Sequence, residues 1–150
     1  QKLSSKLKLS VEDRDKYLLS KLELSELVEK NFLSLKPTDR LKDLIQVISR
    51  SRRNTFPVVN DNGMLEGIIH LDDVRETIFN HDLYDKVIVK GVMNAPAWTI
   101  SPNESLYTAL KKFDETNQWN LPVVDKGKYI GFLSKSSILT RYRNELMESG

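Results

Sequence analysis

One arrangement of residues occurs twice in this chain, with an offset of 65 positions between the copies. The segment 56–60 has the sequence Phe-Pro-Val-Val-Asn, and the segment 121–125 has Leu-Pro-Val-Val-Asp. Each is followed by a polar turn and two glycines, for which we expect turn-forming roles; these are Gly63, Gly67, Gly127 and Gly131. Two copies, rather than the several of a solenoid, predict a pseudo-symmetric pair of repeats with a functional site between them.

Each copy shows the same predicted order of elements: a short helical turn, then strand, helix, strand, strand and helix. The predicted opening turns and first strands cover 24–29, 32–35, 89–93 and 97–100. The following helices have predicted N-caps at Thr38 and Asn103. Their apolar stripes, which we expect to face the core, consist of Leu41, Leu44, Ile45, Ile48, Leu106, Ala109, Leu110 and Phe113. The closing helices are predicted to begin near Asp72 and Ser136.

The segments outside the repeats complete the predicted organisation. Ser10 and Asp13 resemble a capping box that opens a helix before the first repeat. The predicted domains are an N-terminal linker and helix (1–21), the first repeat (22–79), a connector (80–87), the second repeat (88–146) and a tail (147–150). The first residue is Gln1 rather than Met, and we expect the chain to be a piece of a longer protein.

Composition argues against several classes of function. The 23 basic and 21 acidic residues give a net charge of +2, so no general attraction to nucleic acid is expected. The absence of Cys excludes disulfides, thiolate metal sites and Cys nucleophiles. His70 and His81 are too few and too far apart to indicate a metal site. We find no nucleophile beside a general base, and no Gly-rich nucleotide motif, so we expect no catalytic residues and no enzyme activity.

The ordered set of motifs resembles the CBS domain, named from cystathionine β-synthase, and two in tandem resemble a CBS pair, or Bateman module. The resemblance implies an α+β fold of two βαββα repeats packed as a pseudo-twofold pair. The segment 113–129 is similar to the cytoplasmic CBS pair of bacterial CLC-type chloride channels. That narrower similarity implies a cytoplasmic regulatory domain of an integral membrane protein, with a transmembrane channel domain N-terminal to it.

CBS pairs bind adenine nucleotides, such as AMP, ADP or ATP, in two clefts between the repeats, so the resemblance implies a regulatory ligand and no other cofactor. A glycine-led motif supplies a hydroxyl for phosphate and an Asp for the ribose. The first copy keeps the carboxylate in Asp73 but has His70 in place of the hydroxyl residue. The second copy keeps the hydroxyl in Ser134 and has Ser137 in place of the carboxylate. The cleft of Asp73 is therefore favoured, because a carboxylate makes the stronger hydrogen bonds.

The resemblance also implies the remaining site residues. The favoured first cleft is predicted to comprise Asp73, His70, Ile68, Trp98, Trp119, Asn120 and Asn54, and the weaker second cleft Ser134, Ser137, Leu33 and Thr55. Trp98 and Trp119 can stack on a base, or they are core residues that fill the pocket. Asp73 can equally be an acid favoured by the dipole of the closing helix. The basic run 50–53 can face phosphates, or it compensates the C-terminal end of the first helix.

Two functions are favoured from the sequence, ahead of a third class that comprises enzymes and nucleic-acid binders. One is a nucleotide-sensing regulatory module attached to a channel or another effector, and the other is a structural dimerisation module with empty clefts. In both cases we expect a homodimer, because apolar residues on the closing helices exceed what one repeat needs to bury. These residues are Val74, Ile78, Phe79, Ile138, Leu139 and Tyr142.

Overall fold

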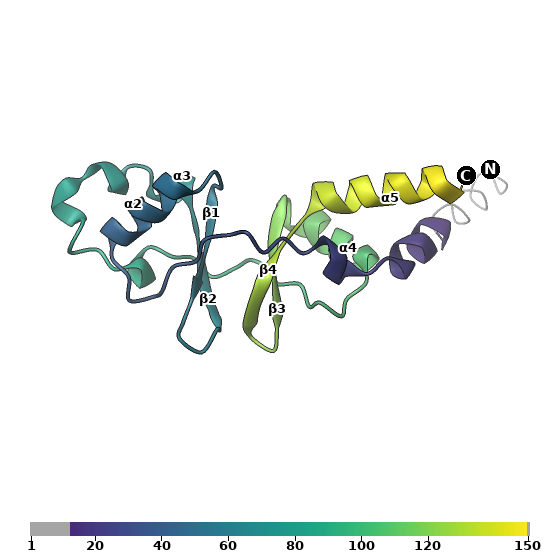
Figure 1. The fold of residues 1–150 in the computed structure, drawn as a ribbon, viewed down its shortest axis with the longest axis horizontal. Coiled ribbons are helices and arrows are strands. Elements are labelled where there is room, and N and C mark those ends of the chain that lie inside the picture. The colour runs from purple at the N-terminus through teal and green to yellow at the C-terminus, as the bar shows by residue number, and fades with distance from the viewer. Residues whose placement is uncertain (1–12, 150) are drawn as a thin grey trace.

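The computed structural model describes residues 13–149 and has the expected mixed α+β fold of two repeats (Figure 1). A helix over 13–21 precedes the repeats, and Ser10 lies outside the described residues. The helices are α2 (Leu41–Arg50), α3 (Leu71–Val74), α4 (Leu106–Thr116) and α5 (Lys135–Ser149), and the strands are β1 (Thr55–Val59), β2 (Leu65–His70), β3 (Asn120–Asp125) and β4 (Lys128–Ser134). Short 3-10 helices cover Leu24–Leu27, Thr77–Phe79, His81–Leu83 and Val89–Gly91. None of the described helices is long and apolar enough to cross a bilayer.

Each repeat contributes one antiparallel hairpin, β1 with β2 and β3 with β4. The predicted opening strands are shorter than expected, because each forms only a one-residue parallel bridge. Leu35 pairs with Val58, and Ile100 pairs with Val123. Pro37 and Pro102 follow two residues later, each at the second position of a β-turn. In these turns the backbone N–H groups of Asp39 and Glu104 donate to the carbonyls of Lys36 and Ser101. Pro at the second position of such a turn is favoured, and it ends the strand.

The same turns correct the predicted helix starts. Thr38 and Asn103 lie inside the turns, so the helices begin later than expected. The N-cap of α2 is Arg40, whose backbone N–H donates to the Asp43 carboxylate at 2.9 Å. The N-cap of α4 is Ser105, whose hydroxyl accepts from the backbone N–H of Thr108 at 3.1 Å.

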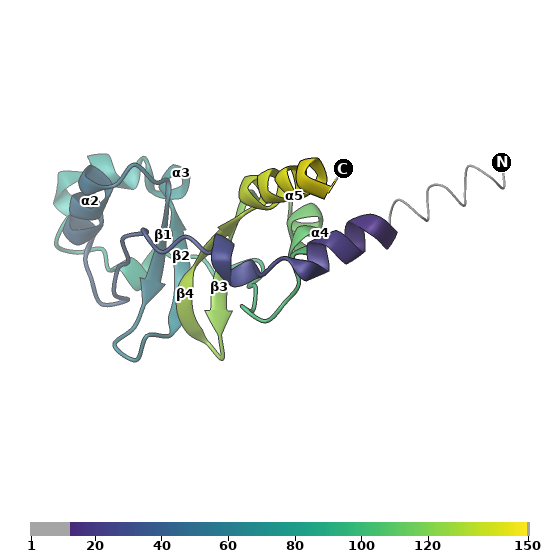
Figure 2. The ribbon, with the colours of Figure 1, turned by 45° about the vertical axis from the view of Figure 1, so that its right-hand side comes forward.

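Each repeat has its own hydrophobic core, and the opening turn of each repeat packs into the core of the other. Leu24 packs among the buried residues of the second repeat, around Phe113 and Ile138. Val89 packs among those of the first repeat, around Leu44 and Phe56. The crossing can be followed in Figures 1 and 2, where the chain passes from the helix over 13–21, beside α4 and α5, to α2 at the other end. The two repeats therefore cannot fold as independent units with these cores.

The helix faces are buried less completely than their stripes predict. Leu41, Leu44, Leu106, Ala109 and Phe113 are fully buried. The stripe residues at the edge of each core are only half-buried; these are Ile45, Ile48 and Leu110.

The closing helices also differ from the expectation of two similar helices. α3 is a single turn, whereas α5 has 15 residues. Of the residues expected to exceed intrachain burial, Val74 and Ile138 are in fact buried in the two cores. The prediction that these two face a partner is wrong, because packing within each repeat already uses them. Phe79 and Leu139 remain exposed, at 74% and 39%.

The paired glycines have two different roles, which corrects the expectation that all four form turns. Gly63 and Gly127 adopt φ values of 79° and 87° in the hairpin turns, a region that favours glycine. Gly67 and Gly131 instead allow a close approach of the backbone. A Cβ at Gly131 would lie 2.5 Å from the Glu29 carbonyl oxygen, and a Cβ at Gly67 would meet the segment 93–94 at 3.0 Å or less. These two glycines therefore admit the segments that form the sides of the clefts.

Candidate ligand-binding clefts between the repeats

The hairpins meet through apolar side chains on β2 and β4. Ile68 and Phe132 are buried together with Phe32, and Tyr129 packs against them. A bulge at Ile130 brings Tyr129 and Phe132 to the same side of β4, where their ring centroids are 6.0 Å apart. This contact packs β2 against β4, and the two clefts lie beside it.

The first cleft contains a pocket of about 100 Å³ that both repeats line. Its lining residues are Ile68, His70, Ala95, Pro96, Ala97, Gln118, Asn120, Leu121, Pro122 and Phe132. The segment 94–97 is held against β2 by two backbone hydrogen bonds between Ile68 and Asn94, of 2.8 and 2.9 Å. Because residues 95–97 are small, the pocket remains open between this segment and β3. Its surface is more apolar than polar and suits a flat group with polar edges.

A second, polar pocket of about 230 Å³ adjoins the first at Asn120, which lines both. Its other lining residues are Phe32, Arg52, Arg53, Asn54 and Thr55. The Thr55 hydroxyl lies 3.4 Å from Nδ1 of His70, so the start of β1 and the end of β2 join the two pockets. Guanidinium, amide and hydroxyl groups are the donors that bind phosphate oxygens. The structure thus brings His70, Ile68, Asn120, Asn54 and Thr55 together.

Asp73 lies beside the first pocket without lining it. Its carboxylate accepts a hydrogen bond of 3.2 Å from the side-chain amide of Asn94, next to the lining residue Ala95. The neighbouring Asp72 is engaged differently, because it forms an exposed ion pair of 2.6 Å with Arg75. Both acids are exposed in the first turn of α3.

Trp98 and Trp119 lie outside the residues that line the two pockets. They are 44% and 62% exposed, so neither is a core tryptophan. Lys112 of α4 lies 5.7 Å from the centroid of the Trp98 ring, and Lys135 of α5 lies 5.2 Å from that of Trp119. Such exposed cation–π contacts contribute about 0.5–1 kcal/mol each. Both rings are therefore accessible, and each already has a lysine of the second repeat beside it.

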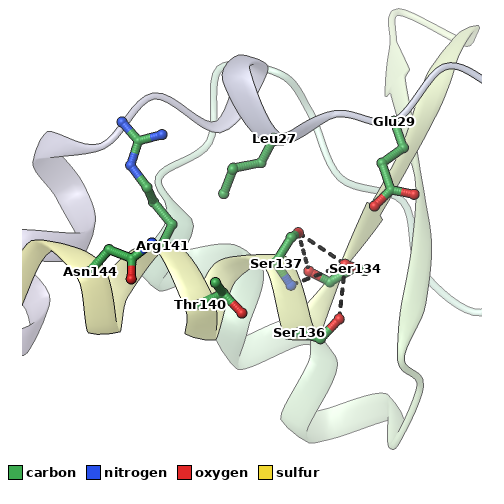
Figure 3. Close-up of a pocket in the computed structure, with 8 residues that line it drawn as sticks. All are labelled: Leu27, Glu29, Ser134, Ser136, Ser137, Thr140, Arg141 and Asn144. Atoms are coloured by element: carbon green, nitrogen blue, oxygen red, sulfur yellow. Dashed lines mark hydrogen bonds between the residues drawn. The ribbon is translucent and has the colours of Figure 1, made fainter.

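The residues predicted for the second cleft fall into separate places. Ser134 and Ser137 line a polar pocket of about 380 Å³ at the start of α5 (Figure 3). The Ser134 hydroxyl accepts from the backbone N–H of Ser137 at 3.1 Å, and the two hydroxyls are 2.9 Å apart. Thr55 lines the polar pocket described above, and Leu33 is 41% exposed and lines none of these pockets.

Arg53 covers the apolar contact between the repeats. Its guanidinium lies 4.1 Å from the centroid of the Phe32 ring, and Phe32 stacks on Phe132 with centroids 4.3 Å apart. Nη2 of Arg53 is 3.0 Å from a carboxylate oxygen of Glu29 and donates to the Asn31 side chain at 2.7 Å. The aromatic pair contributes about 0.5–1.5 kcal/mol beyond its burial.

Tyr129 packs against the same apolar contact, and its pKa is raised. Burial raises the pKa of Tyr129 to about 12, against the opposing effect of the Arg53 charge. Its hydroxyl is buried and has no hydrogen-bond partner among the described residues. Burial therefore favours the neutral, protonated form of the Tyr129 side chain.

Several lining residues were not among the predicted site residues; they include Phe32, Ala95, Pro96, Ala97, Gln118, Leu121, Pro122 and Phe132. The repeat itself holds the signal that could have identified some of them. The 65-residue offset relates Ala97 to Phe32 and Gln118 to Arg53. A comparison of equivalent positions in the two repeats could therefore have marked these four residues as lining the clefts.

Comparisons with known proteins agree with this architecture. The CBS domain family profile matches residues 24–80 and 89–144. An uncharacterized protein of Methanocaldococcus jannaschii, MJ1232, is 32% identical over 111 residues, which cover 73% of this chain and 36% of that protein. A homoserine O-acetyltransferase of Methanosphaera stadtmanae is 27% identical over 83% of this chain and 25% of its own length. The chain thus spans about a third or less of these relatives.

Solved structures show the same fold. A CBS domain protein from Streptococcus pneumoniae TIGR4 superposes with a TM-score of 0.74 and 22% identity, covering 92% of this chain and 97% of that one. The CBS domain of a bacterial CNNM/CorC family Mg²⁺ transporter in complex with ATP has a TM-score of 0.72 and 16% identity, covering 87% and 93%. The narrower similarity to CLC-type chloride channels is not confirmed by these matches and stays a prediction. The two matched segments, covering most of the chain, show that it belongs to the CBS domain family and carries two CBS domains in tandem.

Proposed function

We propose that this CBS pair is a regulatory module that senses an adenine nucleotide in the first cleft. The observation that carries the proposal is that an apolar pocket and a polar, arginine-containing pocket adjoin at Asn120. A nucleotide has the same two-part chemistry, a flat base joined to an anionic chain. The base would lie among the small residues 95–97 and Pro122, and the phosphates would extend past His70 towards Arg52.

Asp73 would hold the ribose in this arrangement. Its carboxylate is already oriented by Asn94 beside the base pocket, and carboxylates accept strong hydrogen bonds from sugar hydroxyls. Trp98 and Trp119 would take part only if a base extends beyond the pocket to their exposed rings. The ATP complex of the CNNM/CorC transporter domain, which has the same fold, supports the choice of ligand class.

The parent protein is part of the same proposal. We propose a transmembrane transport domain N-terminal to this segment, with the CBS pair on the cytoplasmic side. CBS pairs from a Mg²⁺ transporter and from a CBS domain containing membrane protein of Sphaerobacter thermophilus share the fold. A chloride channel is the specific prediction from the sequence. The relatives that bear enzyme names match over about a quarter of their length, and those activities are theirs.

A structural dimerisation module remains the second candidate, and two observations favour it. The apolar pocket holds only about 100 Å³, whereas ligand pockets usually have about 300–1,000 Å³. A groove of about 290 Å³ also lies open between the helix over 13–21, α4 and α5; it is lined by Asp15, Leu19, Tyr107, Leu110, Leu139 and Tyr142.

A thermal-shift titration separates the two candidates. Ligand that binds only the folded state stabilises it, by about 2.7 kcal/mol at a concentration of 100 times Kd. We expect AMP, ADP, ATP or cyclic di-AMP to raise the melting temperature in a saturable way. If none of them does so at millimolar concentration, the sensing proposal fails and the structural module is favoured.

A further inference from the structure

We propose that the base position of the second cleft is filled by the chain's own Phe32 and covered by Arg53, so that the pair of repeats takes one nucleotide rather than two. The polar pocket at Ser134 and Ser137 stays open beside it but is left without a place for the base. The position of the first ligand rests on the proposed function, whereas the closure of the second cleft rests on contacts within the chain.

The pseudo-symmetry of the repeats provides an internal comparison. The 65-residue offset relates Ala97 and Gln118 of the first cleft to Phe32 and Arg53 of the second. Ala97 and Gln118 are exposed and leave the first pocket open. At the equivalent places of the second cleft, the two larger side chains are packed inwards. The clefts therefore share a backbone framework and differ in what fills it.

Phe32 is the occupant of the base position. Only 9% of its surface is exposed, and its ring stacks on Phe132 at 4.3 Å with an interplanar angle of 27°. Phe132 is the equivalent of Ile68, against which the open pocket of the first cleft is built. A nucleobase would need this same face of Phe132. With Phe32 stacked there, this face of Phe132 is not available to a base.

Arg53 fixes this arrangement from outside. Its guanidinium stacks on Phe32, and its Nη2 contacts both the Glu29 carboxylate and the Asn31 side chain. The backbone N–H of Arg53 also donates to the Ser51 hydroxyl at 3.0 Å. A guanidinium stacked on an aromatic ring contributes a favourable cation–π contact, which here holds the Phe32 ring against Phe132.

Glu29 cannot easily move away from this pair. Its backbone exchanges two hydrogen bonds with Phe132, of 2.8 and 2.9 Å, and Gly131 allows that close approach. Glu29, whose carboxylate contacts Arg53, is therefore hydrogen-bonded through its backbone to β4, the strand that carries Phe132. The closure is a built-in feature of the fold and not the conformation of one exposed side chain.

An exchange of residues between the clefts tests the proposal. The variant Phe32→Ala with Arg53→Gln gives the second cleft the residues of the first, and we expect calorimetry with ATP to show one additional site per chain. That is two sites instead of one, or one instead of none if the wild type binds nothing. The latter result would reject the proposed function and still support the closure. Arg143→Gln, which removes an exposed arginine that lines none of the described pockets, should leave the number of sites unchanged.

The reciprocal exchange covers the case in which the first variant does not fold. Ala97→Phe with Gln118→Arg changes two exposed positions and should fill the first pocket with the introduced ring, with at least a tenfold loss of ATP affinity. Asn94 and Pro96 stand at the places of Glu29 and Asn31, so the ring rather than the arginine carries this effect. Two ATP molecules per wild-type chain would overturn the inference. An unchanged number of sites in the folded first variant, or full affinity in the reciprocal one, would overturn it as well.

Discussion

A hydrogen bond of 3.2 Å joins the side-chain amide of Asn94, which donates, to the carboxylate of Asp73. It links the first turn of α3 to the segment that forms one side of the first cleft. The carboxylate is exposed, so a ribose hydroxyl can reach it without displacing a buried group. The acid is thus held in orientation by the chain before any ligand binds.

Asp73→Asn should weaken nucleotide binding by about 1.5–3 kcal/mol, the range for hydrogen bonds to charged groups. This corresponds to roughly a tenfold to hundredfold rise in Kd. Asp72→Asn is the matched control, because Asp72 faces Arg75 in an exposed ion pair and should leave Kd unchanged. Equal Kd values for Asp73→Asn and the wild type would remove Asp73 from the site.

Phe132→Ala should lower the free energy of unfolding by about 3–5 kcal/mol, the usual cost of deleting a buried aromatic ring. Phe132 is 1% exposed and joins the two hairpins through Phe32 and Ile68. Phe79 is 74% exposed, and Phe79→Ala should change stability by no more than about 0.5 kcal/mol. Urea denaturation measures both. Similar midpoints for the two variants would mean that the contact between the repeats contributes little.

Tyr129 should make the fold sensitive to alkali. Its pKa is raised by burial to about 12, so the folded chain keeps this proton more tightly than the unfolded chain, whose tyrosines titrate near pH 10. The resulting stability is complete below about pH 10 and is lost as pH rises to about 12. Tyr129→Phe should flatten the decline in urea midpoint between these values. Tyr17→Phe, at a 61% exposed ring, should retain the wild-type decline, and an identical decline in Tyr129→Phe would contradict the assignment.

We predict a homodimer through the apolar groove at α4 and α5. Leu139 lines this groove and is 39% exposed, so Leu139→Lys should shift the mass measured by light scattering at tens of micromolar from dimer to monomer. Asn62→Lys introduces the same charge at an exposed turn of the β1–β2 hairpin and should leave the dimer intact. A monomeric wild type would contradict the prediction.

The sequence was sufficient to predict the features that depend on neighbouring residues. The glycine turns at Gly63 and Gly127 follow from local backbone preference, and the stripes of α2 and α4 follow from helical periodicity. The helix starts were misplaced for an equally local reason. Thr38 and Asn103 are good N-caps, but the prolines before them form turns that delay the helices.

Other features depend on the assembled fold and could not be predicted in the same way. Leu24 belongs to the first copy in sequence and to the second core in space, and Val89 shows the reverse. Comparing the two sequence repeats shows that they are similar, but it does not show into which core each opening turn packs. The difference between the clefts likewise arises from contacts of Arg53 with Glu29 and Asn31, more than twenty residues away in the chain.

Calorimetric titration of the wild-type chain with AMP, ADP and ATP tests the central claim most directly, because it measures affinity and the number of sites together. The proposed function predicts saturable heat with at least one of these nucleotides, and the closed second cleft predicts one site per chain. No heat with any of the three, from protein shown to be folded, would contradict nucleotide sensing by this CBS pair.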